Sequence, residues 1–547
     1  MTDNSIYLGT ARHSDDSLGE AQHLLLSRAN RHGLVTGATG TGKTVTLQVM
    51  AEGFSRAGVP VFVADIKGDF SGIAAPGATH PAMAERAAVL GVTDYSPAAC
   101  PVAFWDIAGR RGLPVRTTLA AMGPTILSRL LSLNNAQRGA LYAVFGIAKE
   151  RNIRLHTLTD LQKAFNSIAT YPFPKKLPMP PSSSIAAIQR QLIMMEMQGA
   201  TAMFGEPQFD VMDMIRHTPD GRGVVNVLAA ETLIASPRTY STFLFWMLSE
   251  LFEKLPEVGD ADKPKLVFFF DEAHLLFDEQ NKALLQKIEQ IVRMIRSKGV
   301  GVYFISQAPQ DIPDDVLAQL GNRVQHAMRA YTPKAQRAVR SAADTFRPNP
   351  AIDTEAAMGS MVVGEALVSM LDARGVPGMV QRVLIAPPRA HVGPIDDAVR
   401  AAVIAESELG PKYQVPADPA PADTACASTA EVRDQTESTP PPAAAPGPDR
   451  SASPITSSAR LTRPAMAGGT ETWRYEVMGS VWRVVTSAGG SEEMASDWRV
   501  ARASNAGKFN ALSKERQAMM AANDAYNAML AAGFRSDAGS HPTTLNT

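Results

Sequence analysis

Cysteine is scarce in this sequence of 547 residues, which contains only Cys100 and Cys426. Two cysteines so far apart cannot form the set of disulfides that supports small secreted domains, nor the closely spaced pairs of a structural zinc site. His274 likewise has no histidine or cysteine at the spacing of metal ligands. These absences exclude a disulfide scaffold and a zinc-binding module.

Net charge and long hydrophobic runs are also missing. The sequence has 53 basic and 54 acidic residues and a net charge of −1. The protein as a whole is therefore not attracted to nucleic acid, and any basic binding surface must be local. No apolar run reaches membrane-spanning length, and the first residues lack the basic and apolar segments of a signal peptide. We expect a cytoplasmic protein without a membrane span.

The most informative motif that is present is a phosphate-binding loop with the pattern Gly-x-x-x-x-Gly-Lys-Thr. An apolar stretch at 33–36 predicts a strand before it, and helical spacing predicts a helix over 43–57 after it. The glycines let backbone N–H groups surround a polyphosphate, and the start of the helix adds a positive dipole end. We expect the whole loop to bind a nucleotide, through Gly37, Ala38, Thr39, Gly40, Thr41, Gly42, Lys43 and Thr44.

Two loop residues have more specific expected roles. Lys43 is placed to reach the β- and γ-phosphates, and the Thr44 hydroxyl is placed to hold Mg²⁺. A second motif completes the metal site, because five apolar residues (266–270) are followed directly by Asp271 and Glu272. A buried strand there would deliver both carboxylates to the edge of the sheet that carries the loop. We expect Asp271 to assist Mg²⁺ and Glu272 to orient or deprotonate the attacking water.

A third apolar strand, 301–306, ends at Gln307. Gln307 either contacts the γ-phosphate or the attacking water, or only satisfies backbone groups at the strand end. Arg323 begins a further strand and could reach the γ-phosphate of a neighbouring subunit. Arg293 and Arg296 compete for that role, and an ordinary surface ion pair is an equally good interpretation of each.

Other nucleotide-binding classes fit the sequence less well. Asp65 and Gly68 match the Asp-x-x-Gly switch of GTPases, but the nearest candidate for guanine recognition, at 281–284, lacks the required aspartate. A P-loop kinase would not need a glutamate directly after the metal-binding aspartate. The Leu-Ser-Gly-Gly-Gln signature of transporter ATPases is absent. An ATPase is therefore the favoured interpretation.

Apolar runs and helical patterns alternate along the first 412 residues, which predicts an α/β fold with a central, mostly parallel sheet. The long block at about 113–216 has helical spacing and predicts an inserted helical subdomain. Residues 413–469 are rich in Pro, Ala and Ser and predict a disordered linker, and residues 470–547 predict a small α+β tail. In the tail, alternating apolar and aromatic residues on both sides of a turn at 479–480 predict a hairpin, and a helix is expected at about 508–531. The expected strands are 33–36, 59–64, 224–229, 265–270, 301–306 and 323–328, and the expected helices are 43–57, 237–255, 282–297 and 333–343.

Several segments together resemble the HerA-like helicase group of the HerA–FtsK superfamily, and more closely its stand-alone bacterial branch. They occur in the family's order and lie at 64–72, 268–276, 296–303, 313–325 and 364–369. The resemblance covers roughly residues 5–412. It implies a RecA-like core, ATP and Mg²⁺ as cofactors, and hexameric rings with active sites between subunits.

The same resemblance assigns roles to individual residues. Lys43 and Thr44 match the Walker-A pair, Asp271 and Glu272 match the Walker-B pair, Gln307 matches the sensor, and Arg323 is the best match to an arginine acting in trans. The linker and tail lie outside it, so the tail is expected to be a small α+β module or a docking element for a partner.

Three functions remain open from the sequence. The first is an ATP-driven motor acting on double-stranded DNA, in which the DNA part follows from the family resemblance. The second is an ATPase that remodels or moves a protein partner. The third is a nucleotide-dependent binding scaffold with weak hydrolysis, against which the intact Asp271–Glu272 pair argues.

Overall fold

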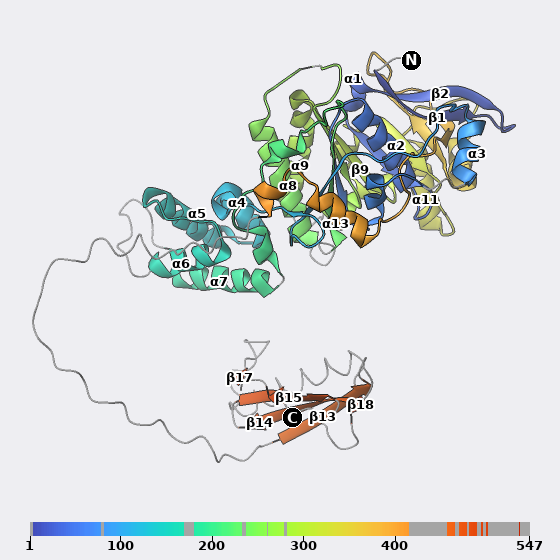
Figure 1. Cartoon of the computed structure of the whole chain (residues 1–547). Helices are drawn as coiled ribbons and strands as arrows, with labels where there is room; N and C mark the ends of the chain where they lie inside the picture. The colour runs from blue at the N-terminus through green and yellow to red at the C-terminus, as the bar shows by residue number, and fades with distance from the viewer. Residues whose placement is uncertain are drawn as a thin grey trace, which may run out of the picture. The chain divides into compact units, whose positions relative to one another are not determined.

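The computed structural model describes residues 4–77, 81–168, 180–197, 199–231, 237–259, 261–277 and 282–414, together with short strands between 457 and 536. The chain separates into two compact units, Met1–Ala430 and Glu431–Thr547 (Figure 1).

The first unit is organised around a twelve-stranded mixed sheet with the order β2-β1-β12-β11-β10-β3-β9-β8-β4-β7-β5-β6. From β10 to β6 all neighbouring strands are parallel. This confirms the predicted central, mostly parallel sheet. The parallel strands are β3 (Gly33–Thr36), β4 (Val61–Asp65), β5 (Val102–Asp106), β6 (Leu113–Pro114), β7 (Val225–Ala229), β8 (Leu266–Phe270), β9 (Val300–Ser306) and β10 (Asn322–His326).

The other end of the sheet is antiparallel and was not predicted. Strand β11 pairs with β10, β12 with β11, β1 with β12, and β2 with β1. All but one of the residues of the outermost strand β2 are partly or fully exposed. These strands are β1 (Ser5–Arg12), β2 (Leu18–Leu25), β11 (Glu365–Ser369) and β12 (Gln381–Ile385).

Alternate residues of each buried strand point to opposite sides of the sheet, so both faces of the sheet are apolar. Helices cover both of these faces. In β8, Phe268 and Phe270 pack with helices α8 and α9, whereas Val267 and Phe269 pack with α2. The covering helices are α2 (Lys43–Arg56), α8 (Pro237–Lys254), α9 (Lys282–Ile295) and α13 (Asp397–Ala405), and the smaller ones are α1 (Leu26–Ala29), α3 (Pro81–Val89), α10 (Asp314–Leu317), α11 (Pro333–Ala343), α12 (Thr354–Ser360) and α14 (Gly410–Tyr413).

The block between β6 and β7 is helical. Helices α5, α6 and α7 group together beside α4 and α8 (Figure 1). Asn134 and Gln137 cap the start of α5 reciprocally, which satisfies two backbone N–H groups that the helix itself leaves unpaired. The helices are α4 (Leu119–Leu130), α5 (Asn135–Glu150), α6 (Leu158–Ile168) and α7 (Ser182–Met197).

The second unit contains an antiparallel sheet. Its central hairpin joins β14 (Thr470–Met478) and β15 (Val481–Ala488), and β13 (Ser457–Pro464) pairs with β14 on the other side. The pairs that complete it involve β16 (Met494–Ala495), β17 (Arg499–Val500) and β18 (Arg535–Ser536). The predicted hairpin of the tail is therefore present, whereas the helix predicted at about 508–531 lies outside the described residues.

Candidate nucleotide-binding site

The phosphate-binding loop connects the end of β3 to the start of α2, as its motif predicts. Gly37, Gly40 and Gly42 have φ angles of 149°, 76° and 113°, which other residues rarely adopt. A side chain at Gly37 would also collide with His326, since its Cβ would lie 2.5 Å from the histidine Cβ. The glycines of the motif are therefore required by the path of the backbone itself.

Lys43 is 7% exposed and points back into the loop. Its Nζ donates to the carbonyl oxygens of Gly37 and Ala38, at 2.5 and 3.0 Å. Burial lowers the pKa of Lys43, and the positive charge of Lys67 lowers it further. These backbone contacts keep the ammonium group in the loop, where a bound polyphosphate could replace the carbonyls as its partner.

The loop is supported from the β10 side by His326. The Ala38 N–H donates to the Ala327 carbonyl at 2.9 Å. The His326 Nδ1 lies 3.0 Å from the Glu365 carbonyl, so it carries the proton, and Nε2 accepts from the Thr46 hydroxyl at 2.8 Å. Burial lowers the pKa of His326 to about 4. A neutral, fully bonded imidazole thus ties the first turn of α2 to the sheet.

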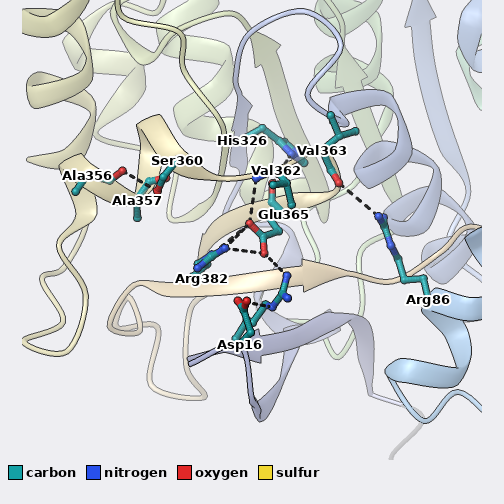
Figure 2. Close-up of polar contacts among 11 residues, drawn as sticks. Asp16, Arg86, His326, Ala356, Ala357, Ser360, Val362, Val363, Glu365 and Arg382 are labelled. Atoms are coloured by element: carbon teal, nitrogen blue, oxygen red, sulfur yellow. Dashed lines mark hydrogen bonds and ion pairs between the residues drawn. The ribbon is translucent and has the colours of Figure 1, made fainter. Parts of the chain in front are cut away.

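A buried carboxylate, Glu365, supports the same side (Figure 2). Its side chain is fully buried and pairs with Arg12 at 2.8 Å and with Arg382 at 2.9 Å, and it accepts from the Val362 N–H at 3.1 Å. Burial would raise the pKa of Glu365, but the bonds from Arg382, Val362 and Arg12 outweigh it and lower this pKa. This cluster fixes the turn that precedes β11.

That turn touches the loop directly. The Gly364 N–H lies 3.4 Å from the Thr41 carbonyl. Arg86, on α3, donates to the Val363 carbonyl at 3.4 Å from the other side (Figure 2). The supporting role of these residues was not predicted, because the contacts that tie them to α2, α3 and β1 join segments more than 270 positions apart in the sequence.

Asp271 and Glu272 follow β8, two strands away from β3 at the same edge of the sheet. Glu272 is 8% exposed and has a left-handed backbone (φ 47°, ψ 50°), an unusual conformation for a residue other than glycine. One oxygen, Oε1, pairs with Lys67 at 2.6 Å. The other, Oε2, lies 3.3 Å from the His274 Nδ1 and is buried without a hydrogen bond.

The loop after β4 completes the site. Asp65 accepts the N–H groups of Gly68 and Phe70 at 2.8 and 3.2 Å, which shapes the loop. Asp69 accepts from the Thr44 hydroxyl at 3.1 Å, and Lys67 reaches Glu272. The sequence marked this segment through its Asp-x-x-Gly pattern and the family resemblance, but no role was assigned to Lys67 or Asp69.

Negative charge is concentrated here. Burial, with a smaller contribution from the nearby carboxylate of Asp69, raises the pKa of Asp65 to about 7. Burial also raises the pKa of Asp271 to about 6, with a contribution from Glu272, while Lys67 acts in the opposite direction. Such closely packed acids are typical of a site that receives a cation.

The donors fit magnesium. The Thr44 hydroxyl and the carboxylates of Asp69 and Asp271 offer only oxygen atoms, which Mg²⁺ prefers. Among the residues that the structure describes, no group of three or more His, Cys, Asp or Glu side chains could hold a metal by itself. A magnesium ion that shares its ligands with nucleotide phosphates does not need such a cage.

Gln307 and Arg323 lie at opposite edges of the sheet. Gln307 is exposed just after β9, at the edge that carries the loop. Arg323 is the second residue of β10, at the opposite edge, and its guanidinium donates to the carbonyls of Leu317, Leu320 and Thr345. The structure therefore does not bring Arg323 to the loop of its own chain, and its three carbonyl bonds count against the role in trans, which stays a prediction.

The two competing arginines are also remote from the loop. Arg293 lies in the last turn of α9 and Arg296 directly follows that helix, shortly before β9 begins. Because β9 runs parallel to β3, its start lies at the sheet edge opposite the phosphate-binding loop. Neither arginine therefore reaches the site of its own chain.

Comparison with known families identifies the class. The family model described as Helicase HerA-like C-terminal matches residues 10–496, so the chain belongs to this family. This confirms the resemblance predicted from the motifs. No curated protein matches the sequence significantly.

Similar arrangements occur in solved structures. VirB4 of Thermoanaerobacter pseudethanolicus is 15% identical with a TM-score of 0.46, and the match covers 70% of this chain and 97% of that one. The bacterial conjugative coupling protein TrwB is 13% identical with a TM-score of 0.45, covering 71% and 91%. At this distance the likenesses carry no functional argument.

Among the described helices, none combines the length and apolar character that crossing a bilayer requires.

Proposed function

We propose that this chain is an ATP-hydrolysing motor of the HerA–FtsK type that acts on double-stranded DNA. The observation that carries the ATPase part is the meeting of the phosphate-binding loop with Asp271, Glu272 and Asp69 at one edge of the sheet. The DNA part is supported by membership of the HerA-like family.

The proposed roles follow from the geometry. The loop N–H groups and Lys43 would bind the β- and γ-phosphates, and Thr44 and Asp271 would hold Mg²⁺ with Asp69 beside them. When bound, the ion would neutralise charge on the phosphate oxygens. Glu272, which has one buried oxygen free of hydrogen bonds, would accept a proton from the attacking water. Gln307 would contact the γ-phosphate or that water.

We also propose a hexameric ring in the cytoplasm, as members of this superfamily are expected to form. The site lies at an edge of the sheet, where a neighbouring subunit could add an arginine. Arg323 would have to break its three carbonyl bonds to serve in this way.

The proposed domain arrangement is a HerA-like ATPase domain (1–412) that contains the helical subdomain, a linker (413–469) and a tail module (470–547). The four helices α4–α7 lie between β6 and β7 and support the insertion. The sheet of the second unit supports a separate tail module, for which we propose a role in docking a protein partner. Its strand β13 lies at 457–464, so this module would begin within the stretch predicted as linker.

The test is steady-state ATP hydrolysis with and without linear double-stranded DNA. Salt must be constant, because binding to the phosphate backbone depends steeply on it. Stimulation by DNA is the expected result. Hydrolysis that no DNA stimulates would contradict the DNA part and favour movement of a protein partner, an alternative with which the net charge of −1 is compatible. Absence of hydrolysis would favour a binding scaffold.

A further inference from the structure

The loop after β4 presents a lysine to the site in a fixed position. Asp65 holds the backbone at Gly68 and Phe70, and Asp69 ties the loop to Thr44 at the start of α2. Strand β4 lies directly beside β8, so the loop faces the carboxylates that follow β8. Lys67 thereby places its Nζ 2.6 Å from the Glu272 Oε1.

The charges around Lys67 are unusual for a surface ion pair. Burial opposes a raised pKa of Lys67, but the hydrogen bond with Glu272 and the charges of Asp271, Glu272 and Asp69 outweigh it and raise this pKa. Lys67 in turn lowers the pKa of Lys43. The ammonium groups of Lys43 and Lys67 therefore lie close together, where the phosphate-binding loop meets Asp271 and Glu272.

Both ammonium groups are bonded to groups of the protein that phosphate oxygens of a nucleotide would have to replace. Lys43 is bonded to carbonyls of its own loop, and Lys67 is bonded to the carboxylate that would activate water. A carboxylate that is paired with an ammonium group is a weaker base for a water proton, because the positive charge stabilises its ionised form. An incoming γ-phosphate offers both lysines a stronger, doubly charged partner.

We propose that Lys67 is a second lysine for the γ-phosphate, which pairs with Glu272 before a nucleoside triphosphate binds and with γ-phosphate oxygens afterwards. This inference rests on the proposed ATPase function. The transfer removes the ammonium charge from Glu272 and makes the carboxylate a stronger base for the reaction. The oxygen of water then bonds to the γ-phosphorus, the bond from that phosphorus to the β–γ bridging oxygen breaks with its electron pair left on ADP, and the water proton passes to Glu272.

The role predicts a difference between nucleotides, because only a triphosphate has the group that Lys67 would contact. Lys67→Met keeps the length of the side chain and removes its charge. We expect the affinity for ADP to change less than twofold, the preference for a non-hydrolysable ATP analogue over ADP to fall about tenfold, and kcat to fall about 100-fold, as when one oxyanion-stabilising donor is lost. Lys67→Arg should recover part of both losses.

The matched control is Lys254→Met. The Lys254 side chain is 40% exposed and paired with Asp210, against 37% for Lys67, but it lies on α8 away from the site. It should leave binding and hydrolysis unchanged. All variants are measured in the full chain, by titration with fluorescent ADP and the ATP analogue and by steady-state hydrolysis.

Two outcomes would overturn the inference. Unchanged or faster hydrolysis by Lys67→Met with an unchanged preference for the triphosphate would make Lys67 only a restraint on Glu272. Equal weakening of ADP and of the analogue, not recovered by Lys67→Arg, would make it a structural residue. If the wild-type chain hydrolyses no ATP, the proposed function fails first, and the binding preference of Lys67→Met still tests the phosphate contact separately.

Discussion

Replacement of Glu365 by glutamine should loosen the β10–β11 side of the phosphate-binding loop. The fully buried carboxylate is paired with Arg12 and Arg382 and accepts the Val362 N–H. Removal of one partner from a buried ion pair costs about 3–5 kcal/mol. Because the two arginine side chains are 25% and 24% exposed, water can hydrate them in part, and we expect a loss of about 2–3 kcal/mol.

Amide hydrogen exchange followed by mass spectrometry measures this loss locally, in peptides from β11 and β12, without assuming that the whole chain unfolds in one step. The control is Glu355→Gln, since Glu355 pairs with Arg340 at 3.4 Å and both side chains are largely exposed. It should cost less than about 0.5 kcal/mol. Equal protection of β11 in Glu365→Gln and wild type, or an equal loss in the control, would refute the reasoning.

Two further predictions concern the loop itself. Lys43→Ala should abolish nucleotide binding in a fluorescence titration, because the ammonium group is the loop's charged contact with the phosphates, and wild-type affinity would contradict its role. Acidification should destabilise the α2–β10 contact. The folded-state pKa of His326, about 4, lies below its ordinary value of 6.5. Stability is therefore lost as the pH falls from the ordinary pKa towards the folded-state pKa, and the loss at pH 5 is about 2 kcal/mol. Hydrogen exchange in α2 between pH 7.5 and 5 measures it, and an identical pH dependence in His326→Asn would contradict the assignment.

The sequence was most informative where structure follows from local pattern. Strand 33–36, the glycine loop and the helix after it form one continuous motif, and β8 is a strand buried on both faces, so its apolar run stands out. The edge strand β2 escaped prediction because its largely exposed residues carry a weak, mixed pattern, and the mostly buried β1 was not predicted either.

Contacts between distant segments could not be predicted from pattern. Lys67 meets Glu272 only because β4 lies beside β8, and His326 reaches Thr46 only because β10 lies beside β3. Arg323 shows the converse. It was the candidate for an arginine acting in trans, but the direction of β10 places it at the other edge of the sheet, where backbone carbonyls bind it. Strand order and strand direction, which no single segment encodes, decide these cases.

The most direct test of the account is a single-turnover measurement of ATP hydrolysis by Glu272→Gln in the full chain. Glutamine keeps the size of the side chain but cannot accept the proton of the attacking water. The account predicts that the variant binds ATP and Mg²⁺ as the wild type does and leaves the bound ATP intact. Conversion of bound ATP to ADP at the wild-type rate would contradict it, because the carboxylate at the centre of the site would then have no part in the reaction.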